Sequence, residues 1–515
     1  MEYVLDAASA KWIDTHTIEE IGMPSLLLME RAALAVAEEA AELCKNHASD
    51  RIGAGPGEMS RMPGTILAIC GSGNNGGDGI AAARILHCRG YRTAVMLAGD
   101  PDRMTGDCRR QLTLARSLGV PVGTAYSMEE ADVIIDALFG IGLSRDIEGR
   151  YADLIHRINH SRAQVLAVDI ASGISADNGQ ILGCAVKADV TVTFGYKKAG
   201  HLLYPGASCT GRLVCAEIGF DPGAVRQLSR VYSIYDDGDL KRLPERVPDS
   251  HKGTYGKVLI IAGSRNMAGA AYLSGLAAYR TGSGLVTLFT PECNRIILQQ
   301  LLPEAVMKTY DETDEPGMLA QLGNQLKAAD VVVLGPGLGK APYAQTLTRQ
   351  VIADCRGPLI ADADALNILS EHMAWLDGHQ QPLIMTPHLK ELSRLTGQSV
   401  QYLKENLVQV CEAFTRKFSV ICISKDVRTM IFDHSGNIYI NVSGNNGMSA
   451  GGSGDVLTGV LAGLIAQGME PEKAARLGVY LHGRAGDAAA GARGVYSMTA
   501  SDLAEGISAV LKNFS

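Results

Sequence analysis

SAGGSGDVLTGVLAGLIAQG, residues 449–468, joins a glycine-rich loop to an apolar helix and is the most informative stretch of the chain. Backbone N–H groups and the helix dipole make such a helix start a binding site for anions. Asp455 falls in about the first turn, where it could accept a proton while the N–H groups of residues 452–454 stabilise a moving phosphoryl group. In the simpler alternative, Asp455 only caps the helix. The chain has no GxxxxGK[ST] motif, which excludes a P-loop enzyme.

The C-terminal half alternates short apolar runs with helical stretches, which is typical of a parallel sheet covered on both faces. At the end of each run, or next to it, stands a Gly, Asp, Thr, His or Lys. Because ligands of open α/β sheets bind at the carboxyl ends of the strands, we expect a site at that edge. The expected strands are 257–263, 285–290, 330–335, 358–363, 382–387 and 420–425.

The N-terminal half shows the same alternation and predicts a Rossmann-like, three-layer α/β/α domain. An amphipathic helix over 25–44 precedes a loop at 51–64 that is rich in Gly and Pro. The expected strands follow at 65–70, 93–98, 132–137, 165–170 and 189–194.

A length of 515 residues exceeds one ordinary core and indicates two domains. The alternation stops between residues 220 and 250, where the sequence becomes polar and contains proline. We interpret this stretch as the linker. The expected domains are therefore 1–225 and 236–515, both α/β.

Composition restricts the partners and the compartment. The net charge is −8 and no run of Lys and Arg occurs, which argues against nucleic acid. The N-terminus does not resemble a signal peptide, and no apolar stretch reaches the ~18 residues that a membrane span needs. Eleven cysteines without CxxC pairs suit reduced thiols. We expect a cytoplasmic homo-oligomer that acts on small molecules and binds neither nucleic acid nor membrane.

The first candidate site combines a glycine loop with two carboxylates. GSGNNGGDG (71–79) follows an expected strand and precedes a helix, so it can hold an anion, although it could also be only a tight turn. Asp136 and Asp169 stand at the ends of two further strands. Each alone could be a helix cap or a structural acceptor. Their placement beside the glycine loop favours a functional role.

NNGGDG, DALFGIGL and VDIASG, in this order, resemble the N-terminal domain of NAD(P)H-hydrate epimerases over residues 1–220. The resemblance implies that Asp169 is the acid/base and that Asn75, Asp136 and Ser172 bind a potassium ion. Ala171 departs from the proline that this family has at that position. The residues implied to hold the hydrated cofactor are Asn74, Asn75, Gly76, Gly77, Asp78, Gly140, Ile141, Gly142, Leu143, Ser144, Arg145, Asp146 and Asp169.

Residues 250–515 resemble the ribokinase-like superfamily and, within it, the ADP-dependent NAD(P)H-hydrate dehydratases, which use Mg²⁺. The motifs are HKGTYGKVLIIAGS, GAAYLSG, GPGLG, DADALN, TPH and GGSGDVLTG. Two positions depart from the family pattern: Leu389–Lys390 follow the TPH motif, and Asp426 follows Lys425 in place of Gly. The resemblance implies hydrate contacts from Ala270 (or Ala271), Gly337, His388 and Asp455, and adenine-nucleotide contacts from Lys425, Asp426, Val427, Arg428, Thr429 and Gly454. His388 could instead be a satisfied polar residue at a strand end.

Together, the two resemblances imply a repair enzyme for NADHX and NADPHX, the hydrates of NADH and NADPH. The first domain would interconvert the R and S epimers. The second would dehydrate the S form at the expense of ADP, giving AMP and phosphate. Two alternatives stay open. One is a ribokinase-like small-molecule kinase with a non-catalytic N-terminal module. In the other, the first half of the chain is a non-catalytic binding module, like the related domain in a scaffold protein of messenger-RNA decapping.

Overall fold

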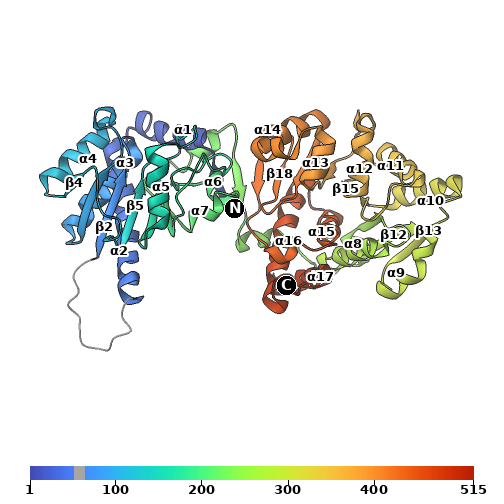
Figure 1. The fold of residues 1–515 in the computed structure, drawn as a ribbon. Coiled ribbons are helices and arrows are strands. Elements are labelled where there is room, and N and C mark those ends of the chain that lie inside the picture. Colours follow the sequence, from blue (N-terminus) through green and yellow to red (C-terminus); the bar gives the residue numbers. More distant parts are fainter. Residues whose placement is uncertain (51–63, 515) are drawn as a thin grey trace. The chain divides into compact units, whose positions relative to one another are not determined.

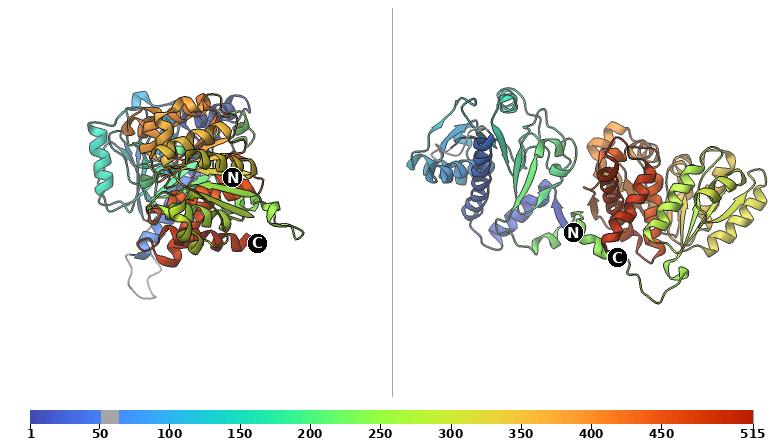
Figure 2. Two further views of the ribbon diagram at one scale, coloured as in Figure 1. Left: turned by 90° about the vertical axis from the view of Figure 1, so that its right-hand side faces the viewer. Right: turned by 90° about the horizontal axis from the view of Figure 1, so that it is seen from below.

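The computed structural model describes residues 1–50 and 64–514 and divides into two compact units (Figures 1 and 2). One unit contains Tyr3–Tyr232, and the other contains Ser233–Ser515 together with Met1–Glu2. The loop expected at 51–64 lies outside the described residues, apart from Gly64.

The first unit is built on a parallel sheet of seven strands. The strands lie in the order β4 (Val122–Gly123), β3 (Arg92–Leu97), β2 (Thr65–Cys70), β5 (Val133–Ala137), β6 (Gln164–Val168), β7 (Val190–Phe194) and β9 (Arg212–Ala216). Outside this sheet, β1 (Glu2–Leu5) pairs in parallel with β8 (Lys197–Lys198). The helices are α1 (Ala7–Glu19), α2 (Ser25–Asp50), α3 (Asn74–Cys88), α4 (Gly106–Ser117), α5 (Arg150–His160), α6 (Ala199–Leu202) and α7 (Ala207–Thr210).

Helices cover both faces of this sheet because its strands are apolar on both sides. In β2, Ile66 and Ala68 pack under α2, α3 and α4, whereas Leu67 and Ile69 pack against α5 and the segment after β6. Successive strand residues point to opposite faces, so a continuous apolar run fills two layers of core. The expected three-layer arrangement is confirmed.

The second unit has a larger mixed sheet. Its strands lie in the order β13 (Val306–Tyr310), β12 (Leu285–Pro291), β11 (Lys257–Ile261), β14 (Val331–Leu334), β15 (Leu359–Ala361), β16 (Leu383–Met385), β17 (Val420–Ser424), β18 (Met430–Phe432), β19 (Ile438–Ile440) and β10 (Tyr232–Ile234). The pairs from β13 to β17 are parallel, and β17–β18 and β18–β19 are antiparallel.

One face of the second sheet carries α8 (Ala268–Thr281), α15 (Ser453–Ala466), α16 (Pro471–Arg493) and α17 (Ala500–Leu511). Helix α9 (Arg295–Leu301) follows β12 on this side. The other face carries α10 (Glu315–Ala328), α11 (Pro342–Asp354), α12 (Asp364–Glu371), α13 (Leu389–Thr396) and α14 (Val400–Phe418). Helix α15 is buried from Val456 to Ala466 and packs along α8, which explains the apolar character of the sequence after Asp455.

Two expectations about local structure need correction. Helix α3 begins at Asn74, so only Gly71–Gly73 form the loop and the rest of the glycine motif is helical. A Cβ at Gly76 would lie 2.1 Å from the carbonyl oxygen of Gly71, so glycine is required for the helix to start this close to the strand end.

The stretch interpreted as a linker also contains packed structure. Ala224 and Val225 are buried with residues of α1 and β1, and Tyr235 packs against Tyr439 and Tyr480. The short strand β10 was not predicted from the sequence, because polar residues surround its few apolar ones. The longest uninterrupted exposed run of this stretch begins at residue 245 and continues to residue 254.

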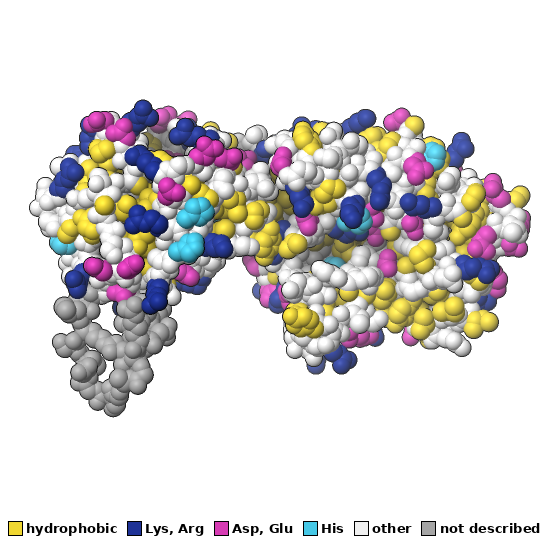
Figure 3. Space-filling view, viewed as in Figure 1, with side chains coloured by type: hydrophobic (Ala, Val, Ile, Leu, Met, Phe, Trp, Pro, Cys, Tyr) yellow, Lys and Arg dark blue, Asp and Glu magenta, His cyan; other side chains and the backbone are white. Residues whose placement is uncertain are grey.

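The surface carries both signs of charge. Figure 3 shows acidic and basic side chains interspersed over the visible face. Within residues 1–50 and 64–514, no helix is both long and apolar enough to cross a membrane.

Candidate active sites

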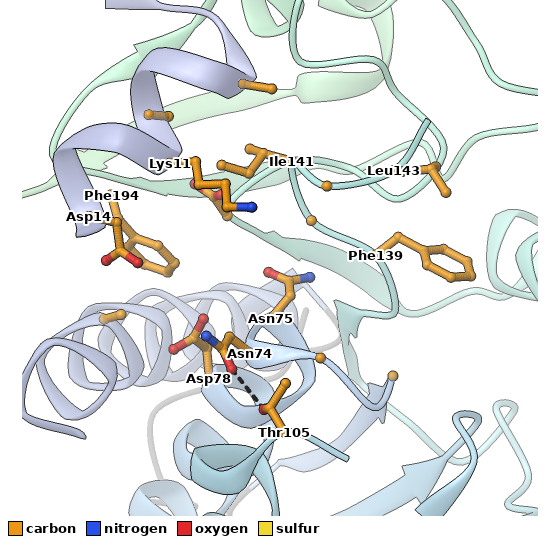
Figure 4. Close-up of a pocket in the computed structure, with 18 of the residues that line it drawn as sticks. Lys11, Asp14, Asn74, Asn75, Asp78, Thr105, Phe139, Ile141, Leu143 and Phe194 are labelled. Atoms are coloured by element: carbon orange, nitrogen blue, oxygen red, sulfur yellow. Dashed lines mark hydrogen bonds between the residues drawn. The ribbon is translucent and has the colours of Figure 1, made fainter. Parts of the chain in front are cut away.

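The first site is a cavity of about 1000 Å³ in the N-terminal unit (Figure 4). It lies between α1, α2, the start of α3, the loop after β5 and the ends of β6 and β7. A volume of this size is at the upper end for small-molecule sites and suits a dinucleotide. The predicted residues that line it are Asn74, Asn75, Asp78, Gly140, Ile141, Gly142, Leu143, Ser144, Arg145 and Asp169.

Gly76, Gly77 and Asp146 are not part of this lining. The two glycines allow close packing around the start of α3. A Cβ at Gly77 would lie 2.8 Å from Cε of Met29, and one at Gly76 would meet Gly71. Asn74 is fixed by the hydroxyl of Thr105, which donates to its Oδ1 at 2.7 Å (Figure 4).

Asp169 has a strained and fully engaged backbone. Its φ is +64°, in the left-handed region that residues other than glycine rarely adopt. Its N–H donates to Val192 O at 2.7 Å, and its carbonyl oxygen lies 2.9 Å from Nε2 of His201. These bonds hold Asp169 in place even though Ala171 replaces the stiffer proline. Such strain is often found at functional sites.

The Asp169 side chain is held by a buried lysine. Nζ of Lys198 donates to Asp169 Oδ1 at 2.6 Å, and the hydroxyl of Thr193 donates to the same oxygen at 3.0 Å. Burial acts to raise the pKa of Asp169, but the charge and hydrogen bond of Lys198 outweigh it, and the pKa is lowered. Asp169 is therefore an ionised carboxylate at neutral pH.

His201 is a neutral donor in this cluster. Its Nδ1 accepts from the N–H of Lys198 at 3.0 Å, so Nε2 carries the proton and donates to Asp169 O. Burial, followed by the charge of Lys198, lowers the pKa of His201 to about 3. The imidazole thus supports the Asp169 backbone without changing charge.

Asp136 and Ser172 form a second buried cluster beside the cavity. The hydroxyl of Ser172 donates to Asp136 Oδ1 at 2.7 Å, and its N–H donates to Oδ2 at 2.9 Å. Burial raises the pKa of Asp136 to about 6 in spite of these bonds. Asn75 reaches the same turn, since a Cβ at Gly140 would lie 3.3 Å from it. The three predicted metal ligands therefore surround one turn, Asp136–Gly140.

The second site lies where the glycine loop meets α15. Gly452 is the N-cap residue, with φ +96°, and Asp455 sits in the first turn of the helix. The alternative in which Asp455 is merely the cap residue is therefore not what the structure has. Burial and the nearby charge of Asp362 raise the pKa of Asp455 to about 7. A carboxylate with such a pKa can take up a proton at neutral pH.

Lys425 and Asp362 form a buried ion pair next to this loop. Lys425 Nζ lies 2.6 Å from Asp362 Oδ1, which also accepts from the hydroxyl of Thr386 at 2.7 Å. A Cβ at Gly454 would lie 3.3 Å from Lys425 Nζ. The loop N–H groups and the lysine ammonium thus converge on one place, which suits a transferring phosphoryl group.

The remaining predicted residues of the second site fall into two groups. A Cβ at Gly337 would lie 2.8 Å from Ala270, so those two residues are adjacent. Of the nucleotide loop, Val427 is 71% exposed, and Asp426 Oδ1 accepts from the Val427 N–H at 2.8 Å. The carboxylate of Asp426, which replaces the family's glycine, therefore accepts a hydrogen bond from the backbone of its own turn.

His388 has a structural task that the sequence pattern did not reveal. Its Nδ1 accepts from the N–H groups of Lys390 and Glu391 and caps α13. The side chain remains about half exposed, and Nε2 lies 3.4 Å from Glu391 Oε1. The backbones of His388 and Lys425 form an isolated parallel β-bridge, so the TPH motif lies beside the nucleotide loop.

Several residues of both sites were missed by sequence reasoning. Lys198 and His201 stand in GYKKAGHL after β7, and Asp362 opens the DADALN motif that was recognised without a role. For Asp362 the available signal was a polar residue directly after an apolar strand, whereas Lys198 and His201 stand four and seven residues beyond the end of β7 and had no such signal. Asp14 of α1 had no such signal.

The two halves match two family models. Residues 25–200 match the model described as YjeF-related protein N-terminus, and residues 258–509 match NAD(P)H-hydrate dehydratase. The chain is 36% identical to a bifunctional NAD(P)H-hydrate repair enzyme of Moorella thermoacetica, over 99% of this chain and 97% of that protein. It is 37% identical to one of Thermofilum pendens, over 97% and 94%.

Solved structures resemble the C-terminal unit. A ribokinase-like superfamily protein of Enterococcus faecalis is 28% identical, with a TM-score of 0.50, and the match covers 55% of this chain and 96% of that one. A hypothetical protein of Streptococcus mutans is 31% identical, with a TM-score of 0.50, over 55% and 100%. The ribokinase-like fold expected for this half is confirmed.

Proposed function

The chain belongs to the family of bifunctional NAD(P)H-hydrate repair enzymes, and we propose that it restores NADH and NADPH from both epimers of their hydrates. The observation that carries the proposal is the presence in one chain of two aspartates whose pKa values are shifted in opposite directions. Asp169 is ionised beside a cavity of about 1000 Å³, and Asp455 has a pKa of about 7 beside an anion-binding loop. We assign epimerisation to residues 1–225 and dehydration to residues 236–515.

In the first domain, Asp169 is the acid/base that exchanges protons as water leaves and returns at the hydrated carbon. Lys198 keeps this carboxylate ionised and His201 fixes its backbone. The start of α3 and the loop Gly140–Arg145 hold the dinucleotide. The helix start suits its phosphates, since α3 points free N–H groups at the cavity edge.

A potassium ion fits the turn Asp136–Gly140. One carboxylate, one hydroxyl and one amide meet there, and oxygen donors of this kind suit a hard cation. Nδ2 of Asn75 is buried without a hydrogen-bond partner among the described residues. The oxygen and nitrogen of an amide are nearly equal in size, so rotation of this side chain by half a turn places its oxygen there as a ligand for a cation. We propose Asn75, Asp136 and Ser172 as the ligands, with the ion neutralising negative charge beside the bound hydrate.

In the second domain, Asp455 takes the proton from the ring hydroxyl of the S hydrate as ADP phosphorylates it, and the phosphate ester then leaves together with the proton on the neighbouring ring carbon, so that the ring C=C bond forms. The N–H groups of the loop and Lys425 stabilise the phosphoryl group, and loss of phosphate then restores the reduced cofactor. Ala270, Gly337 and His388 would contact the hydrate, and residues 425–429 with Gly454 would contact the adenine nucleotide.

Magnesium fits the charge balance of this site. Asp362 and Asp364 both act to raise the pKa of Asp455, and Lys425 is the cation that opposes them. A divalent cation that enters on the nucleotide phosphates would relieve this repulsion. Mg²⁺ would supply charge neutralisation for the phosphates, and the protein would orient the hydroxyl.

We further propose that the enzyme is a cytoplasmic homo-oligomer. None of its eleven cysteines, which all lie within the described residues, forms a disulfide, and this suits a reducing compartment. Exposed apolar side chains on α9, including Ile296 and Ile297, would suit a contact between copies. Sedimentation of the purified chain tests the oligomeric part.

The decisive experiment supplies mixed hydrate epimers with and without ADP and follows the absorbance of reduced nicotinamide. We expect full conversion of both epimers with ADP and none without it. Conversion of only half of the mixture would refute the epimerase assignment. ADP consumption without reduced cofactor would favour the small-molecule kinase, although the full-length relatives align with both halves.

A further inference from the structure

Asp14 and Asp78 are carboxyl groups in the first cavity that no step above uses. Asp14 comes from α1 and Asp78 from the second turn of α3, and both line the cavity. In Figure 4 both carboxyl groups point into the space between these two helices. Asp78 is only 9% exposed, and no hydrogen bond to its carboxyl group occurs within the described residues. It is thus a buried polar group aimed at the site without a partner.

Neither carboxyl group has a cationic side chain as a hydrogen-bond or ion-pair partner within the described residues. Lys198 Nζ donates to Asp169 at 2.6 Å, Thr193 at 2.7 Å and Phe194 O at 3.3 Å, which uses all three of its N–H bonds. His201 is neutral. Lys11 of α1 and Arg145 also line the cavity, but their side chains are exposed and neither forms a hydrogen bond or ion pair with Asp14 or Asp78. An ionised carboxylate buried without a counter-charge is costly, so it keeps its proton instead.

The electrostatics agree with this arrangement. Burial, then the charges of Asp169 and Asp14, raises the pKa of Asp78 well above its usual range. Burial and the charge of Asp169 raise the pKa of Asp14, with Lys198 opposing them. Neighbouring carboxyl groups whose environments separate their pKa values divide into an acid and a base.

We propose that Asp78 is the proton donor of the first site and that Asp14, facing the same space, keeps the proton on Asp78. This inference rests on the proposed epimerase function, in which Asp169 accepts the proton. Asp78 would be a catalytic residue, and Asp14 a positioning residue that acts through it.

The step balances as follows in atoms and charge. The Asp78 carboxyl proton moves to the hydroxyl oxygen on the hydrated carbon, the C–O bond breaks, and water leaves. The lone pair of the ring nitrogen forms a C=N bond. Water then adds to the other face of the ring and gives its proton to Asp169. Lys198 favours the ionised form of Asp169, so Asp169 releases this proton to water in the cavity. Water then returns a proton to Asp78 before the next turnover.

The test measures interconversion of separated R and S hydrates by the full chain without ADP, as a function of pH. Asp78→Asn should lose about 100-fold or more, because the amide resembles the protonated acid in shape but cannot donate its proton. Its melting temperature should stay equal or rise. Asp14→Asn should move the fall in kcat/KM at high pH to lower pH by roughly one unit, because a neighbouring negative charge is gone.

Glu19→Gln is the matched control, since Glu19 is an exposed acid on the same helix outside the cavity. It should leave the pH profile unchanged. A folded Asp78→Asn within a few-fold of wild type, or an Asp14→Asn with an unmoved profile, overturns the inference. If Asp169→Asn is inactive in the same assay while Asp78→Asn is active, only this inference fails. If Asp169→Asn is also active, the proposed epimerase mechanism itself fails.

Discussion

At the scale of single residues, Asp455 is the sharpest test of the second domain. Asp455→Asn keeps the size of the side chain and the N–H donors of the loop, but it cannot accept the hydroxyl proton. We expect a loss of about 100-fold or more in ADP-dependent dehydration. Epimerisation should be unchanged, because it belongs to the other domain. A variant with normal turnover and a normal melting curve would leave Asp455 with a purely structural role.

The pH dependence follows from the state of the same carboxylate. A base must be unprotonated, and the pKa of Asp455 is about 7. The rate of wild-type dehydration should therefore rise with pH through about 7. Measurement of kcat/KM between pH 6 and pH 8.5 checks this. A rate that falls over that interval would contradict the assignment of Asp455 as the base.

Lys198 gives a residue-scale prediction for stability. Lys198→Met leaves Asp169 buried without its cation, and breaking such a pair costs about 3 kcal/mol. The folded pKa of Asp169 is lowered, so the pair stabilises the protein above the carboxylate's unfolded pKa and less as pH falls. Urea unfolding should show a larger penalty at pH 7 than at pH 4. Lys197→Met, which leaves the 2.6 Å contact intact, is the control.

At the scale of elements, the start of α3 depends on close packing of glycine. Gly76→Ala would place a Cβ 2.1 Å from the Gly71 carbonyl oxygen, and that backbone cannot move without shifting the loop at the cavity. We expect a loss of about 3 kcal/mol together with epimerase activity. Gly77→Ala meets the flexible end of Met29 at 2.8 Å and the Cα of Cys108 at 3.2 Å, and it should cost about 1 kcal/mol. Equal melting temperatures for both variants would show that the loop can yield.

The elements also show how far the sequence alone reaches. Asp136 and Asp169 were predictable, because continuous apolar strands end at them and parallel strands bring their ends together. The pairings made by Lys198 and Asp362 were not predictable, since a contact such as Lys425–Asp362 joins positions 63 apart in sequence. Helix capping by His388 depends on the local dihedral angles of its loop. Strand β10 was missed because three residues in a polar stretch carry no periodic signal.

At the scale of the whole molecule, the two units should fold separately, provided that the chain is divided before β10. Val231 packs with the first unit, whereas Tyr235 packs on Tyr439 and Tyr480 of the second. A division at 235 would therefore leave part of the second core on the wrong fragment. Fragments 1–231 and 232–515 should each unfold cooperatively. The first should epimerise and the second should dehydrate only the S hydrate.

A division at 235/236 is the control and should yield a less stable second fragment, because it removes β10 and Tyr235. If both divisions give equally stable fragments, β10 contributes nothing to the second core.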